Sequence, residues 1–84
     1  MAEEQVGVVT HYFGHISVGI VQLSAPLKVG DTIHIKGAKD DFTQAVDSMQ
    51  IEHEAVESGK KGDFVGTKVA QRVHPHDKVF VVLE

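Results

Sequence analysis

Histidine and carboxylate side chains are the residues of this chain that could hold a metal ion. The sequence has six histidines and 12 aspartates and glutamates, and it has no cysteine. His74, His76 and Asp77 form the tightest group, and zinc accepts imidazole nitrogens together with a carboxylate. Two histidines in one turn do not make a site by themselves. We therefore expect no metal and no cofactor, with these three residues as weak candidates.

Cations and aromatic rings near one short glycine loop could contact a nucleic acid. The cations could bind phosphate, and an outward-facing aromatic ring could stack on a base. Carboxylates at positions 52, 54 and 57, just upstream of the loop, would repel phosphate, so solvated lysines in a polar loop are the alternative. The RNA-contact candidates are Lys60, Lys61, Lys68, Arg72, Phe64 and Phe13.

The glycine and lysine at positions 59 and 60 resemble the end of a phosphate-binding P-loop only superficially. Residue 54 is glutamate, and Lys61 stands where serine or threonine is needed. Residues 59–62 also match the GXXG loop of KH domains, but here the loop precedes a strand. No serine lies on a nucleophile elbow. We expect neither nucleotide binding nor enzymatic activity.

The composition indicates one globular domain with an acidic balance. A chain of 84 residues has room for one core. The formal net charge is −4, whereas a nucleic-acid binder usually presents a basic surface. Residues 1–4 are acidic and lack the apolar segment of a signal peptide, and no apolar run reaches the ~20 residues of a membrane span. We expect a cytoplasmic protein without membrane contact.

Short runs of β-branched and aromatic residues predict a chain made of strands. Phe42 and Val46 fall in one parity class and Met49 and Ile51 in the other, which predicts a bulge in a long strand. No segment has a sustained 3.6-residue period, so no helix is expected. The expected strands are residues 6–13, 17–23, 32–36, 42–52, 64–70 and 78–83.

A turn ending in aspartate recurs before three of these strands. Glycine supplies the positive φ of a tight turn, and the aspartate carboxylate can accept a hydrogen bond from a nearby backbone N–H. Histidine stands in the glycine position of the last turn, where it is uncommon but tolerated. The expected structural turns are Gly30-Asp31, Gly62-Asp63 and His76-Asp77.

These features predict an all-β fold, a small six-stranded antiparallel closed β-barrel formed by residues 1–84 as a single domain. Closure is expected because it removes exposed strand edges. Residues 1–5 are expected to be a flexible N-terminal tail. The predicted core consists of Val8, Val18, Ile20, Ile33, Ile35, Val46, Met49, Val65, Val69, Val79 and Val81.

The turns and strands, in this order, resemble domain 2 of translational GTPases such as elongation factor Tu, a small β-barrel. The resemblance covers residues 6–83, with two departures: Gly14-His15 replaces a more basic turn, and His76 replaces a glycine. Short stand-alone proteins and the C-terminal domains of some collagenase-like peptidases carry similar barrels, and the chain looks most like those. The matching segments are Phe13–Ile16, Val18–Val21, Leu27–Ile33, Val46–Ile51, Gly62–Gly66, Val69 and His76–Val79.

The resemblance implies a non-catalytic, translation-factor-like module that contacts tRNA or ribosomal RNA. The acidic balance favours the alternative, a protein-interaction module that docks onto an enzyme or complex without nucleic-acid contact. A structure separates the two hypotheses. Four cations converging on one face beside an exposed aromatic ring would favour RNA, whereas cations scattered among carboxylates would favour docking.

Overall fold

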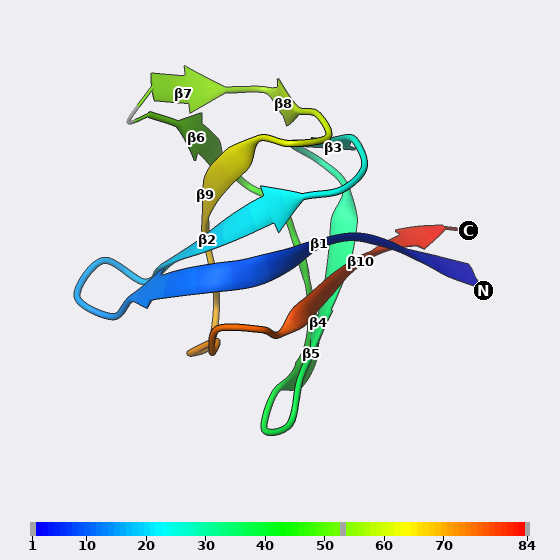
Figure 1. Cartoon of the computed structure of the whole chain (residues 1–84), viewed down its shortest axis with the longest axis vertical. Coiled ribbons are helices and arrows are strands. Elements are labelled where there is room, and N and C mark those ends of the chain that lie inside the picture. Colours follow the sequence, from blue (N-terminus) through cyan, green and yellow to red (C-terminus); the bar gives the residue numbers. More distant parts are fainter. Residues whose placement is uncertain (1, 53, 84) are drawn as a thin grey trace.

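The computed structural model of the chain describes residues 2–52 and 54–83 and consists of strands and the turns between them (Figure 1). None of the described segments forms a helix long and apolar enough to cross a membrane. The strands are β1 (Ala2–Phe13), β2 (Val18–Leu23), β3 (Leu27–Lys28), β4 (Thr32–Lys36), β5 (Asp41–Ala45), β6 (Met49–Ile51), β7 (Glu54–Val56), β8 (Ser58–Gly59), β9 (Phe64–Lys68) and β10 (Lys78–Leu83).

Antiparallel pairing joins eight strands into one sheet, in the order β5-β4-β10-β1-β2-β9-β6-β7, while β3 and β8 form a separate pair. The predicted all-β antiparallel fold is confirmed. The predicted closed six-stranded barrel is not, because no ladder within residues 2–52 and 54–83 joins β5 to β7. Figure 1 shows β6 and β7 at the top of the view and the β4–β5 hairpin at the bottom.

The segment from 42 to 52, predicted as one bulged strand, is two strands that pair with different partners. β5 pairs with β4, whereas β6 pairs with β7 and β9. Between them, the Val46 N–H donates to the Asp31 carbonyl at 2.8 Å, and the Val46 carbonyl accepts from the Gly30 N–H at 2.9 Å. The change of parity therefore marks a break between strands, because Val46 is bonded to the turn before β4.

The side chain of Gln44 connects the β5 edge of the sheet to the chain leaving β9. Its Nε2 donates to the Lys68 carbonyl at 2.8 Å, and its Oε1 accepts from the Ala70 N–H at 2.7 Å. One amide side chain thus occupies both a backbone acceptor and a backbone donor. These two bonds cross a gap that no strand ladder spans within the described ranges.

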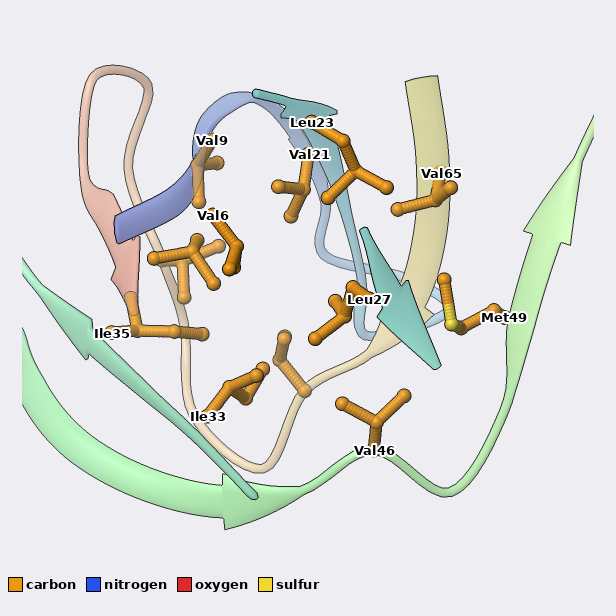
Figure 2. Close-up of a cluster of buried hydrophobic side chains, with 13 residues drawn as sticks. Val6, Val9, Val21, Leu23, Leu27, Ile33, Ile35, Val46, Met49 and Val65 are labelled. Carbon is orange, nitrogen blue, oxygen red and sulfur yellow. The ribbon is translucent and has the colours of Figure 1, made fainter. Parts of the chain in front are cut away.

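The core lies on the inner face of the curled sheet (Figure 2). Of the predicted core residues, Ile33, Ile35, Val46, Met49, Val65, Val69 and Val79 are buried, and Val81 packs against them while half-buried. Leu27 from β3 and Val73 from the segment before β10 are also buried, although neither was predicted.

Val8, Val18 and Ile20, which the sequence places in the core, are only half-buried. In β1 the pairing register shifts between Gln5 and Gly7 and again between Val9 and His11. Such irregularities change which side chains point inward, so Val6 and Val9 are the buried residues. In β2 the inward residues are Gly19, Val21 and Leu23, which leaves Val18 and Ile20 on the outer face.

Three turns have the same local geometry. Gly30, Gly62 and His76 have φ values of 99°, 93° and 77°. A Cβ at Gly30 or Gly62 would meet no atom within 4 Å, so backbone conformation and not crowding favours glycine there. In each turn an aspartate Oδ2 accepts from the backbone N–H three residues earlier, at 3.1 Å for Asp31, 3.0 Å for Asp63 and 2.9 Å for Asp77.

The two ends of the described chain lie side by side. Ala2 of β1 is opposite Leu83 of β10, and residues 2–5, where a flexible tail was expected, pair with β10 as part of β1. Figure 1 shows both ends at the right of the view, away from the turn that joins β1 to β2. The described ends are thus joined by the β1–β10 ladder.

Candidate functional site

An apolar groove lies on the outer face of the sheet, over β1, β2, β9 and β6, and we call it the outer groove. Its volume is about 410 Å³. This size falls within the range of sites that bind small ligands or side chains of a partner. The outer groove is lined by His11, Phe13, Ile16, Val18, Ile20, Gln50, Glu52, Phe64 and Gly66.

Strand pairing assembles the floor of the outer groove from residues that are distant in sequence. Ile20 lies beside His11 on one side and beside Gly66 on the other, and Gly66 lies beside Gln50. A Cβ at Gly66 would sit 3.3 Å from both the Ile20 Cδ1 and the Val18 Cγ1. The side chains of Ile20 and Val18 therefore close over Gly66, because glycine lets neighbouring groups approach its backbone, and the three residues form the floor of the hollow.

Large apolar side chains border this hollow and remain exposed. Phe13 is 41% exposed, Ile16 51% and Phe64 53%. The rings of His11 and Phe13 stack with their centroids 6.4 Å apart and their planes 18° from parallel. Exposed apolar side chains gathered around a hollow are typical of an interaction surface, because binding removes that surface from water.

Gln50 and Glu52 make one end of the outer groove polar. Gln50 lies in β6, and Glu52 follows that strand with a φ of 52°. Glu52 is exposed and forms no ion pair within the described residues. The groove thus combines an apolar floor with one amide, which can bond a peptide backbone, and one carboxylate, which can attract a cation.

The four predicted cations are spread around β9 and are not gathered at one point. Lys60 and Lys61 precede β9 and Lys68 ends it, so at least about 13 Å of extended strand separates the lysine pair from Lys68. Lys61 lines a different hollow, beside Gln22. Arg72 lies near enough to Asp40 that its charge contributes to the low pKa of that carboxyl. Phe13 and Phe64 do share a site, the outer groove, but without the lysine pair.

A second cluster brings together Asp40, His74 and Asp77, whose ligand atoms all lie within 4.8 Å of one another. His74 Nδ1 is 2.7 Å from Asp40 Oδ2. His76, a predicted metal candidate, is exposed and does not belong to this cluster. Asp40, which does belong, was not predicted because the β4–β5 hairpin brings it to His74 from 34 positions away.

Asp40 and Asp77 form a carboxyl pair whose two pKa values move apart. The hydrogen bond from Asp77 lowers the pKa of Asp40, whereas burial, followed by that same bond, raises the pKa of Asp77. Within the described residues no buried side-chain nitrogen or oxygen lacks a hydrogen-bond partner.

Most of the outer groove was not predicted from the sequence. Ile16 and Gly66 were not among the predicted site residues, and Val18 and Ile20 were assigned to the core. The available signal was the alternation in residues 18–23, where Val21 and Leu23 share one face and Val18 and Ile20 share the other. An apolar outer face on a strand whose inner face is also apolar indicates burial on both sides.

Comparison with known proteins relates the chain to peptidases. No family model matches the chain. The chain is 38% identical over 81 residues to an uncharacterized protease of Methanocaldococcus jannaschii, a match that covers 95% of this chain and 20% of the protease. The chain therefore spans about a fifth of the length of this curated relative.

Two solved structures of the C-terminal domain of a Geobacillus thermoleovorans protein, described as a U32 peptidase, have the same fold. One superposes with a TM-score of 0.89 at 20% identity, covering 95% of this chain and 93% of that one. Its selenomethionine variant superposes with a TM-score of 0.87 at 22% identity, covering 90% and 96%. At these identities the likeness establishes the fold.

These similarities correct the resemblance to domain 2 of translational GTPases. The translation-factor identification and the translation function that it implied are wrong, because the relative and the two structural neighbours are a protease and peptidase domains. The residues that carried the resemblance are mainly turns before strands. Such turns redirect the chain in many antiparallel folds, so they do not specify a family.

Proposed function

We propose that this chain is a non-catalytic docking module of a U32-type peptidase system, and that it binds protein. The observation that carries the proposal is the 38% identity along 95% of the chain to one fifth of a protease. A segment of that size is a domain of the larger protein. A domain that leaves most of a protease outside itself is suited to holding the enzyme or its substrate.

The outer groove supports a binding role for the module. Its residues provide an imidazole, an amide and one carboxylate, and they include no serine, threonine or cysteine that could act as a nucleophile. Three exposed apolar side chains around one hollow provide surface that gains free energy when a partner covers it. The separation of the lysine pair from Lys68 along β9 and the formal net charge of −4 support protein over RNA as the partner.

The proposal can be tested by rebuilding a protease from two parts. The curated relative would be produced without the 81-residue segment that matches this chain. Circular dichroism would establish that the truncated protease folds, and calorimetry would measure its binding to this chain and, as the positive control, to the relative's own segment. We expect both to bind, and we expect this chain alone not to hydrolyse casein or fluorogenic peptides.

Two results would contradict the proposal. Hydrolysis by the purified chain would refute the non-catalytic role, and binding of the relative's own segment without binding of this chain would refute docking. An acceptor-stem RNA added to the ¹⁵N-labelled chain is expected to leave the amide spectrum unchanged. Shifts that weaken as salt rises would instead show an electrostatic RNA contact.

A further inference from the structure

The floor of the outer groove selects for a bulky apolar side chain. The side chains of Ile20 and Val18 close over Gly66, and this floor is apolar. Phe13 and Phe64 are both about half exposed while they line the same hollow. An apolar group that enters the groove would be surrounded by this apolar lining. A polar or phosphorylated group would lose water there without gaining hydrogen bonds.

The polar end of the outer groove selects for a positive charge. Glu52 carries the one formal charge among the lining residues, and within residues 2–52 and 54–83 it has no ion-pair partner. The formal net charge of the chain, −4, adds an attraction for a basic partner. Gln50, between the hollow and Glu52, offers an amide donor and acceptor suited to a peptide backbone.

The spacing between these two features is set by the sheet. Gln50 is on the strand next to Gly66, about 4.8 Å away, and Glu52, which follows β6 with a φ of 52°, lies at most about 6.6 Å further along. The backbone of Glu52 is therefore at most about 8 Å from that of Gly66. An extended peptide advances about 3.3 Å per residue, so its cation should follow two or three residues from its apolar anchor.

We propose that the outer groove binds an extended segment of a partner protein in which a bulky apolar side chain, seated on the floor formed by Val18, Ile20 and Gly66, is separated by two or three positions from a lysine or arginine that pairs with Glu52. This inference deepens the proposed docking function, on which it rests, because it names the site and the chemistry of the partner segment.

The test uses peptides, so it does not depend on finding the natural partner. The ¹⁵N-labelled chain would be titrated with acetyl-Gly-Ser-Phe-Ser-Arg-Ser-Gly-amide and with the same peptide carrying Glu in place of Arg. We expect amide shifts at Ile20, Gln50 and Gly66, with the Arg peptide binding about tenfold more tightly than the Glu peptide. Glu52→Gln should remove most of that preference.

Two further variants distinguish binding in the outer groove from non-specific binding to exposed apolar side chains. Phe64→Ser should weaken binding of the Arg peptide about tenfold, because it removes an aromatic wall. Leu83→Ser is the matched control, because Leu83 is 43% exposed and lies in β10, outside the groove lining. Leu83→Ser should leave binding unchanged, and dispersed spectra would show that both variants fold.

The outcomes distinguish this inference from the proposed function. If the chain docks onto the truncated protease while Phe64→Ser and Glu52→Gln leave that docking and the peptide shifts unaltered, the groove inference fails and docking stands. If peptide shifts map to the groove while the protease is not bound, the groove stands and the proposed function fails. A concentration-dependent dimer that covers the groove, detected by ultracentrifugation, would overturn the inference in favour of a second copy.

Discussion

The Gly37→Ala variant should be less stable than the unmodified protein, although replacing glycine by alanine stabilises a protein where the backbone conformation suits both residues. A Cβ at Gly37 would overlap Asp77 Oδ1 and lie 2.6 Å from Asp77 Cγ. The Asp77 side chain, which is only 4% exposed, would have to move and lose its bonds to the His74 N–H and to Asp40. Hydrogen bonds that involve charged groups contribute about 1.5–3 kcal/mol each, and Gly→Ala returns about 0.4–1 kcal/mol of chain entropy.

The substitution should therefore lower the free energy of unfolding by about 2–5 kcal/mol. This is a large part of the ~4–13 kcal/mol expected as the total free energy of unfolding for 84 residues. Urea unfolding at pH 7 would measure it, with an unchanged m-value showing that the denatured state is unaffected. The matched control is Gly37→Ala in an Asp77→Ala background, where the carboxylate is gone. There the substitution should be neutral or slightly stabilising, and an equal loss in both backgrounds would refute the reasoning.

Four other substitutions test three separate features. His34 forms hydrogen bonds with Asp41 and Glu3, and these bonds raise its pKa above 6.5. Their stabilising contribution should be complete below pH 6.5 and should disappear as the pH rises through the folded-state pKa. The melting temperature, measured from pH 5.5 to 8.5, should therefore depend less on pH in His34→Gln than in the unmodified protein. Gln44→Leu should cost about 1–3 kcal/mol and speed hydrogen exchange at the Ala70 amide. Met49→Ala should cost about 2–5 kcal/mol in urea, whereas Ile16→Ala, in the outer groove, should change stability by less than about 0.5 kcal/mol.

Features set by neighbouring residues were predictable from the sequence. The turns at Gly30, Gly62 and His76 require a positive φ and an aspartate one position later. Each turn is therefore determined by four consecutive residues. The alternation around Ile33 and Ile35 likewise identified β4 and its buried face. These elements depend little on the rest of the chain, so local chemistry was sufficient.

Features set by distant pairing were not predictable. The break after β5 depends on hydrogen bonds between Val46 and the turn at Gly30 and Asp31, which no local pattern shows. The register shifts in β1 reversed the expected faces, and they arise from its pairing with two strands at once. Closure of the sheet was inferred only from the advantage of removing edges, and the observed order leaves β5 and β7 unpaired with each other in the described ranges.

The candidate site likewise combines residues that were predictable from the sequence with residues that strand pairing alone brings together. Phe13 and Phe64 were identified because aromatic side chains at strand ends stand out in a sequence. Gly66 and Ile20 gained significance only when pairing placed them side by side, 46 positions apart. The cation candidates were chosen by type, and their separation along β9 follows from strand geometry, which composition does not encode.

The pairing of Ala2 with Leu83 has a mechanical consequence. β1 and β10 are antiparallel neighbours, so tension applied to the two ends would pull their ladder apart from one end. The rungs would break one after another, and each would carry the full load alone. A protein tethered in this way should yield at low force by peeling, whereas a sheet pulled along its strands would have to shear many hydrogen bonds together.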